Sequence, residues 1–486
     1  MLLFFICVAI LVRFPFFFKA VIDWDESTYI LTGQDILNGH LPYTHLFIAK
    51  PPLGLLGYSL FILLFGKSVI GIRIAGALCV GAASYILYRS VRRIYGKIPG
   101  ILSGAFLIIL SSTMGSGMAT MMEHLALVPI CIVIFLFTRQ DLTVKDIFLM
   151  GLAIGAMSLI RRNMIYMGAA SGGVLVYLNY RYGIKRLCRM LLVFIAGGML
   201  LPALFVLIYA VNGTLDTFYR ALITFAVSFV TAQENTYTQK LAMFKDVLKK
   251  DMLTHNLIIW ELFVAGVVSA FTYFRGGRQK IYSSIMLILT AGVAASCIEM
   301  GRKFPHYLIH LAPFIGVFAA LPIVFLKRMR YKIIAGAFII LIPLVPVLKK
   351  YPAVFDSLIK NEAFNDTAYK VADYLKRRNV RDQYIYVLHY HIIYWLTGAK
   401  VPSVFVHPQD IYKDYCVRFH LGEGATSSTA LLRILDKQPR FIVMSKLFWL
   451  QKSVPVPFKK LMLNELKKRY ALANEIDGIL IFERLL

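Results

Sequence analysis

The sequence predicts a polytopic α-helical membrane protein with a C-terminal extracytoplasmic α/β domain. Of its 486 residues, 58% are hydrophobic and only 16% are charged, whereas soluble domains carry about 25% charged residues. Several apolar runs approach or exceed the roughly 17–25 residues that cross a bilayer. From about Tyr351 the composition changes to that of a soluble domain. These observations together predict a helical membrane part followed by a separate α/β part.

Hydropathy predicts about eleven transmembrane helices in the first 350 residues. The N-terminal run lacks a basic leading region and a small-residue cleavage site, so we interpret it as a retained first span. The pair 146–160 and 163–179 is short, and losing one of the two would invert everything downstream. The predicted spans lie near 2–18, 69–88, 98–113, 122–138, 146–160, 163–179, 190–210, 256–274, 281–298, 306–326 and 331–348.

Five basic connections alternate with less basic ones and predict the topology. By the positive-inside rule these five are cytoplasmic. The segments 19–68, 114–121, 211–255 and 299–305, and the chain after about Lys349, then face outward from a bacterial inner membrane. The basic connections are Arg89–Lys97, Arg139–Lys145, Arg181–Arg189, Arg275–Lys280 and Lys327–Lys332.

The net charge of +27 does not indicate nucleic acid binding. Many Lys and Arg residues stand at the ends of apolar runs, where they orient the chain and contact anionic membrane lipid. The six cysteines have no CxxC spacing, and only Cys416 lies in the polar C-terminal part. Neither a metal cluster nor a disulfide framework is indicated, and we expect no metal ion or other cofactor.

Three acids directly after the first predicted span form the most informative stretch, Asp23-Trp24-Asp25-Glu26. Ionised groups are costly beside hydrocarbon, so a cluster of acids there indicates a function. The alternative is that Asp25 and Glu26 only favour the first turn of a helix that reaches about Leu37. We expect that helix to lie on the membrane as an amphipathic helix. A second apolar helix is expected from Pro51-Pro52 to about Phe65.

Lys50 and Glu123 are two further candidates in the outer segments. Lys50 precedes two prolines, which deny it a helical backbone and fix its direction. Its ammonium suits a lipid phosphate, or it extends to the interface as an anchoring lysine. Glu123 opens the fourth span beside His124. It either completes an acidic pocket with Asp25 or favours a helix N-terminus.

Cations on the predicted outer side oppose the topology rule and therefore suggest phosphate binding. Arg161 and Arg162 separate two spans, and Arg302 precedes His306 and Tyr307. Guanidinium groups bind phosphate oxygens in pairs. Interfacial anchoring is the alternative for His306 and Tyr307.

The last part of the chain, 351–486, alternates short apolar runs with helical periodicity. The sequence therefore predicts a domain boundary near residue 350, between a transmembrane catalytic domain (1–350) and a soluble extracytoplasmic α/β domain. Strands are expected at Tyr384–Val387, Ser403–Val406, Phe441–Met444 and Gly478–Phe482, and helices at 366–378, 426–437 and 457–469.

The order of these motifs resembles the polyprenyl-phosphate-dependent GT-C membrane glycosyltransferases, the group of the protein O-mannosyltransferases and the lipid A aminoarabinose transferase. Three pieces carry the resemblance: Asp25-Glu26 with Tyr29 and the run Asn38–Tyr43; Lys50-Pro51-Pro52-Leu53; and Arg302 through His306-Tyr307 with Pro313. The resemblance implies Asp25 with Glu26 as catalytic acids, Glu123 as an assisting acid and Lys50 as the phosphate ligand. It also implies a soluble domain after the last span.

We therefore predict an inverting glycosyltransferase that moves a sugar from a polyprenyl-phosphate-linked donor to a lipid, glycan or protein acceptor in the cell envelope. Asp25, Glu26 and Glu123 are the predicted catalytic residues. A transporter or flippase of lipid-linked saccharides is the alternative, and a scaffold protein is a third. The sequence contains no P-loop, HExxH or GxSxG motif. The predicted donor and phosphate site is Lys50, Tyr29, Tyr43, Arg161, Arg162, Arg302, His306 and Tyr307.

Overall fold

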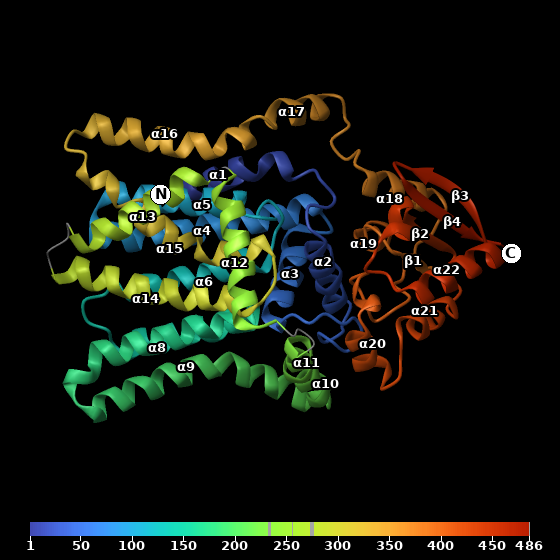
Figure 1. The fold of residues 1–486 in the computed structure, drawn as a ribbon, viewed down its shortest axis with the longest axis horizontal. Helices are drawn as coiled ribbons and strands as arrows, with labels where there is room; N and C mark the ends of the chain where they lie inside the picture. Colours follow the sequence, from blue (N-terminus) through green and yellow to red (C-terminus); the bar gives the residue numbers. More distant parts are fainter. Residues whose placement is uncertain (232–234, 255, 273–276, 486) are drawn as a thin grey trace.

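The computed structural model describes residues 1–231, 235–254, 256–272 and 277–485. A long bundle of helices carries a smaller unit with a β-sheet at one end (Figure 1). The chain leaves the bundle through α16 (Met329–Leu348) and α17 (Tyr351–Ile359) and then enters the smaller unit. The predicted domain boundary at residue 350 falls between these two helices and stays a prediction.

Every predicted span corresponds to a helix in the described residues. Residues 273 and 274 of one predicted span, and Arg275 of the basic connection after it, lie outside those residues. The helices are α1 (Leu2–Arg13), α4 (Val69–Tyr95), α5 (Lys97–Thr113), α6 (Met122–Leu136), α7 (Val144–Ile160), α8 (Ile165–Asn179), α9 (Ile184–Val211), α13 (Leu257–Thr272), α14 (Gly277–Glu299), α15 (Ala312–Ala319) with 3-10 turns on both sides, and α16.

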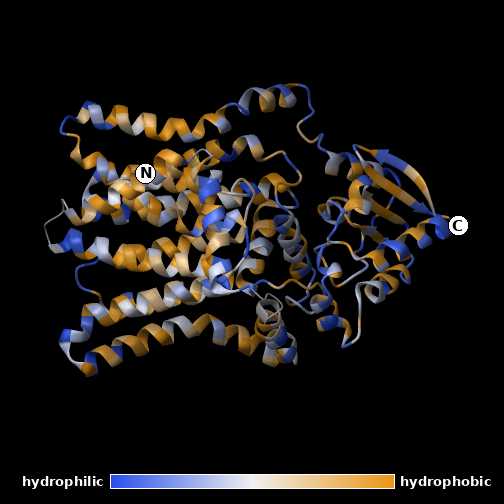
Figure 2. Ribbon diagram, viewed as in Figure 1, coloured by the Kyte–Doolittle hydropathy of each residue, from blue (hydrophilic) through white to orange (hydrophobic). Residues whose placement is uncertain are grey.

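Within the described residues, five segments are long and apolar enough to cross a membrane, or six if the bent pair α12 (Tyr237–Met252) and α13 is one span. The five are α4, α9, α14, residues 305–325 and α16. Apolar side chains of α9 and α16, among them Leu192, Met199 and Phe338, are exposed, and Figure 2 shows hydrophobic residues along both helices. An apolar surface of this extent indicates contact with membrane lipid. The chain is therefore a multi-pass membrane protein, and the count of eleven spans stays a prediction.

The two helices of the first outer segment are α2 (Trp24–Leu37) and α3 (Pro52–Phe65). They pack closely, because a Cβ on Gly33 would stand only 2.9 Å from Cβ of Tyr58. The short α19 (Ile392–Thr397) of the C-terminal unit also packs against α2. Most of α2 is therefore buried. The C-terminal unit contacts α2 at Thr28 and Gln34. The expectation that α2 lies on the membrane as an amphipathic helix stays a prediction.

Further short helices cover the same end of the bundle, namely α10 (Leu215–Tyr219), α11 (Phe225–Thr231) and α12. The remaining elements form the small α/β unit: α18 (Thr367–Arg377), β1 (Ile385–Val387), α20 (Asp414–Leu421), α21 (Ser427–Leu435), β2 (Phe441–Ser445), α22 (Val456–Arg469), β3 (Tyr470–Ile476) and β4 (Ile479–Arg484). The strand order is β1-β2-β4-β3, and only the β1–β2 pair is parallel.

The strand predicted at Ser403–Val406 is not part of this sheet. Phe405 instead forms an isolated parallel bridge with Phe47 of the first outer segment. The amide of Phe47 donates to the carbonyl of Val404 at 2.8 Å. This run is therefore extended, as its composition predicts, but it pairs with a distant part of the chain through a single bridge.

We expect the α8–α9 connection and the C-terminal unit to label from opposite sides of the membrane. Figure 1 shows them at opposite ends of the bundle, which agrees with the positive-inside topology. Cys188 is exposed near the start of α9, next to that connection, whereas Cys416 is buried. Glu423, which is exposed, therefore gives a better outer position.

The measurement is maleimide labelling of intact cells that carry either Cys188 alone or a Glu423→Cys substitution alone. We expect only the Glu423→Cys protein to react before the cells are opened. Reaction of both proteins in intact cells would contradict the topology. The same background with Arg92→Cys, also exposed and predicted cytoplasmic, is the matched control.

Candidate active site

Asp25, Lys50 and Tyr29 meet at the first turn of α2. Oδ2 of Asp25 accepts hydrogen bonds from Nζ of Lys50 at 3.0 Å and from the hydroxyl of Tyr29 at 2.9 Å. The four-residue spacing puts Asp25 and Tyr29 on one face of the helix, and Pro51 with Pro52 directs Lys50 toward them. The side chains of Lys50 and Asp25 are 21% and 27% exposed. This ion pair therefore remains accessible to a ligand.

The two neighbouring acids Asp23 and Asp25 have opposite electrostatic surroundings. Burial raises the pKa of Asp25, but the Lys50 ammonium, His306 and His407 outweigh it and hold that pKa well below its usual range. Burial and the charge of Asp25 raise the pKa of Asp23, whose side chain caps α2 by accepting from the Asp25 amide at 2.8 Å. Asp25 is therefore the stronger acid of the two.

Glu26 points away from this ion pair into a buried network. Its carboxylate accepts from Arg73 at 2.8 and 3.2 Å and from the amide of Thr120 at 2.6 Å. The side chains of Glu26 and Arg73 are 1% and 0% exposed. Glu26 therefore stabilises the packing of α2 against α4 and the second outer segment. Arg73 was missed in the sequence, although an arginine inside a predicted span is a signal of function by itself.

The second outer segment, 114–121, is held in place by Arg13, another arginine inside a predicted span. One guanidinium nitrogen of Arg13 donates to the carbonyl of Ala119 at 2.8 Å, and the other donates to that of Gly117. Gly115 has a φ of +44°, and a Cβ there would stand 2.6 Å from the amide nitrogen of His306. Only glycine fits this close approach, which brings the segment against the start of the tenth predicted span.

Glu123, Arg161, His306 and Tyr307 form a second charged cluster. An oxygen of Glu123 lies 2.6 Å from the Arg161 guanidinium and 3.9 Å from Nε2 of His306. The guanidinium of Arg161 also lies over the ring of Tyr307, 4.7 Å from its centroid. All four side chains are buried. Four residues from three distant segments, each singled out in the sequence, therefore come together here.

Tyr43 and Arg162 hold the backbone next to Lys50. The hydroxyl of Tyr43 donates to the carbonyl of Lys50 at 2.7 Å, and Arg162 donates to that of Ala49 at 3.2 Å. Both side chains therefore orient Lys50 through its backbone. Arg302 is half-buried and lies within electrostatic range of Lys413 in the C-terminal unit.

Three histidines of the C-terminal unit surround Trp24, which precedes Asp25. The ring centroids of His389, His391 and His407 lie 5.0, 5.9 and 5.9 Å from that of Trp24, and Nε2 of His391 lies 2.8 Å from the Thr28 hydroxyl oxygen. Burial lowers the pKa of His389 and His391. No local pattern in the sequence predicts this cluster, because its members come together only where the C-terminal unit packs against α2.

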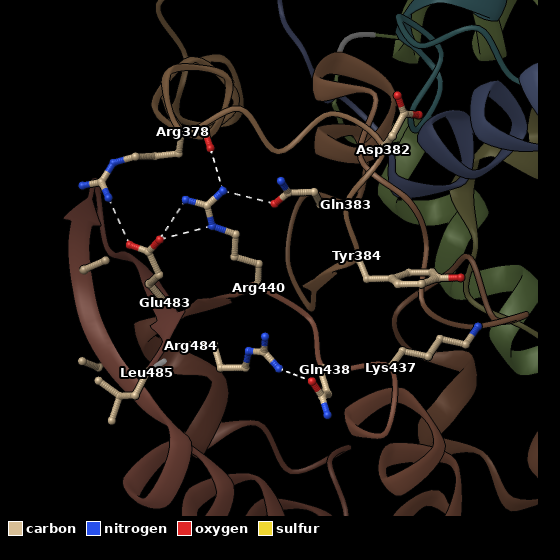
Figure 3. Close-up of a pocket in the computed structure, with 12 residues that line it drawn as sticks. Arg378, Asp382, Gln383, Tyr384, Lys437, Gln438, Arg440, Glu483, Arg484 and Leu485 are labelled. Carbon is tan, nitrogen blue, oxygen red and sulfur yellow. Dashed lines mark hydrogen bonds and ion pairs between the residues drawn. The ribbon is translucent and has the colours of Figure 1, made fainter.

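A cavity of about 900 Å³ lies elsewhere, on the C-terminal unit. Figure 3 shows Arg378 and Arg440 directed at Glu483, with Arg440 also bonded to Gln383. These cations are therefore engaged within the fold. None of the predicted site residues lines this cavity.

A family model described as dolichyl-phosphate-mannose-protein mannosyltransferase matches residues 49–209. The matched region includes Lys50 of the first charged cluster and Glu123 and Arg161 of the second. It also includes Arg162, which donates to the backbone next to Lys50. This match confirms the resemblance to the GT-C membrane glycosyltransferases and, with it, the prediction that the chain is a glycosyltransferase.

The fold is that of ArnT. The crystal structure of ArnT from Cupriavidus metallidurans bound to undecaprenyl phosphate gives a TM-score of 0.67 at 14% identity, over 99% of this chain and 98% of that one. The apo structure of the same protein gives 0.66 at 12% identity, over 99% and 97%. The Archaeoglobus fulgidus oligosaccharyltransferase gives 0.48 at 14% identity, over 92% and 68%. A comparison with curated proteins finds no match.

Proposed function

We propose that this glycosyltransferase moves a sugar from a polyprenyl-phosphate-linked donor to a lipid, glycan or protein acceptor on the outer face of a bacterial inner membrane. The Asp25–Lys50 pair carries the proposal, because it offers a base and a phosphate ligand 3.0 Å apart. The protein of like fold was solved with undecaprenyl phosphate, so this carrier is the first to test. A transporter or flippase is not favoured, because the family match is to a transferase.

The proposed reaction is a single displacement with inversion at the anomeric carbon. The acceptor hydroxyl or amine attacks that carbon, and the bond from the carbon to the phosphate oxygen breaks. The acceptor proton passes to Asp25, and the lipid phosphate leaves as an anion beside Lys50. A phosphate leaving group needs little acid assistance, whereas a neutral nucleophile must lose its proton as it attacks.

Lys50 has a double role in this proposal. Without donor its ammonium is paired with Asp25, and this pairing lowers the pKa of Asp25 and weakens it as a base. When the donor phosphate takes the ammonium, burial acts on Asp25 with less opposition and raises its basicity. The base is thus activated by donor binding, which couples phosphate recognition to proton transfer. Glu123, Arg161 and His306 form the neighbouring side of the proposed site. The hydroxyl of Tyr29 orients the carboxylate of Asp25.

The test is transfer by the purified full-length protein in nanodiscs, supplied with polyprenyl-phosphate-linked sugars and an envelope extract as acceptor. We expect release of free polyprenyl phosphate and a glycosylated product, both detected by mass spectrometry. Release in the absence of any acceptor would indicate hydrolysis. Accumulation of donor across a sealed vesicle without bond cleavage would overturn the proposal in favour of transport.

We expect Lys50→Ala to weaken donor binding by about ten- to a hundredfold, since a charged hydrogen bond contributes roughly 1.5–3 kcal/mol. Lys50→Arg keeps the charge and should lose much less. The measurement is the Kd for polyprenyl phosphate. Lys67→Ala is the matched control, because Lys67 lies in the same outer segment but contacts the ring of Trp395. Unchanged affinity in Lys50→Ala would assign Lys50 to membrane anchoring.

A further inference from the structure

A second group of metal-binding side chains lies at the other end of α2, away from the proposed site. Nδ1 of His40 and Nδ1 of His45 lie 2.9 and 2.7 Å from the same oxygen of Asp35. Within the described ranges of the chain, this is the group of three or more His, Cys, Asp or Glu side chains whose donor atoms all lie within 4.8 Å of one another. We propose that Asp35, His40 and His45 bind a first-row divalent metal ion, for which Zn²⁺ is the probe.

The donor set and its spacing suit such an ion. Two imidazoles and one carboxylate are ligands that zinc takes, with a fourth position left for water. Ligand atoms around tetrahedral zinc lie roughly 3.3 Å apart when the bonds are about 2.0–2.1 Å. Both nitrogens therefore lie slightly too close to the Asp35 oxygen and must move away from it by about half an ångström. The histidines are 44% and 54% exposed, so both rings are free to make this movement.

The ring arrangement brings both donor nitrogens to one place. The imidazoles are stacked, with centroids 4.3 Å apart and planes 26° apart, and both Nδ1 atoms lie next to Oδ1 of Asp35. A neutral imidazole that carries its proton on Nε2 offers Nδ1 as a metal ligand. Asp35 itself is buried, with its side chain 8% exposed, so the open side of the site faces solvent through the histidines.

The turn at residues 39–44 brings the two histidines together. Gly39 and Tyr43 both have positive φ, +99° and +73°, and a tyrosine in that region carries strain. Thr44 closes the turn by donating its amide to the carbonyl of Leu41 at 3.2 Å. Histidines five residues apart thereby stack on one carboxylate.

A metal ion here would fix the segment that orients Lys50. Tyr43, between the two histidines, donates to the Lys50 carbonyl, and Tyr209 donates to the carbonyl of Pro42 at 3.0 Å. We therefore assign the ion a structural role, in which it clamps residues 38–45 and holds Tyr43 against Lys50. This assignment does not depend on the proposed sugar transfer.

The experiment uses the full-length protein in nanodiscs, without a polyhistidine tag, stripped with chelator and titrated with Zn²⁺ against a chromophoric competitor. We expect one tightly bound equivalent by elemental analysis and slower hydrogen exchange of residues 38–50 when Zn²⁺ is present. His45→Gln should lower the affinity by more than about 100-fold, beyond the 10- to 100-fold that loss of an outer partner costs. His45→Cys, which keeps a ligand, should retain binding.

His389→Gln is the matched control, because His389 belongs to the other histidine cluster of the described structure. Retained Zn²⁺ binding in His389→Gln supports the assignment. Loss of Zn²⁺ binding in His389→Gln together with retained binding in His45→Gln would overturn it. Absence of a bound equivalent in the parent protein would also overturn it and leave a hydrogen-bonded cluster only. Each variant is first checked for a monodisperse elution profile. Sugar transfer by the parent is measured separately, so that failure of one proposal leaves the other intact.

Discussion

Replacing Asp25 by Asn is expected to lower sugar transfer by about 10²–10⁴-fold, the usual contribution of general-base assistance. Asn keeps the shape of the side chain and still accepts from Tyr29, but it cannot take a proton. Donor binding should be unchanged or tighter, because Lys50, which pairs with Asp25 at 3.0 Å, becomes free for the phosphate. The expected signature is a fall in kcat without a rise in the Kd for polyprenyl phosphate.

The measurement is transfer from a polyprenyl-phosphate-linked sugar by purified protein in nanodiscs. The Asp25→Asn, Glu26→Gln double variant is tested beside the single one, to check that Glu26, which is buried and paired with Arg73, does not replace Asp25 as the base. Lys67→Ala again serves as the control for changes in the same outer segment. Turnover within a few-fold of the parent in both the single and the double variant would remove Asp25 from catalysis and bring the transport alternative forward.

Replacing Arg73 by Met is expected to destabilise the protein by about 3–5 kcal/mol, because it leaves the Glu26 carboxylate buried without its cation. Arg73 also donates to the carbonyl of Phe16, so the 3-10 turn after α1 loses a partner as well. The measurement is the temperature at which the monodisperse peak is lost in size-exclusion chromatography.

The matched variant is Arg73→Met with Glu26→Leu, which removes both charges. Replacing a buried ion pair by apolar residues is often neutral, so most of the lost stability should return. Lys50→Met breaks a half-exposed pair and should change the melting temperature little. If Arg73→Met melts like the parent, the Glu26–Arg73 pair does not brace the second outer segment.

The helical part was predictable because hydropathy and charge act locally. Each predicted span corresponds to a helix, and the apolar helix expected from the proline pair to about Phe65 is α3. The separation of Asp25 from Glu26 was not predictable, because adjacent residues on a helix point about 100° apart. Which of them meets Arg73 depends on where α4 packs. Whether either acid is catalytic stays a prediction until the variants are measured.

The C-terminal unit shows where local patterns are insufficient. Helices 427–435 and 456–469 follow their apolar periodicity, but β3 was missed. It is an edge strand with mostly exposed or half-exposed residues, and a register shift between Leu472 and Asn474 interrupts its alternation. Ser403–Val406 has the composition of a strand, yet its partner lies more than 350 residues earlier in the chain. A pairing over that distance leaves no sign in a short window.

The bridge between Phe47 and Phe405 affects how related enzymes could be recombined. Together with the contact of His391 with Thr28, it joins the first outer segment to the C-terminal unit at two places. A chimera cut near residue 350 would pair one parent's α2 with another parent's covering surface. Exchange of the C-terminal unit should therefore succeed only when residues 20–50 come from the same parent, so that these two regions are inherited as one piece.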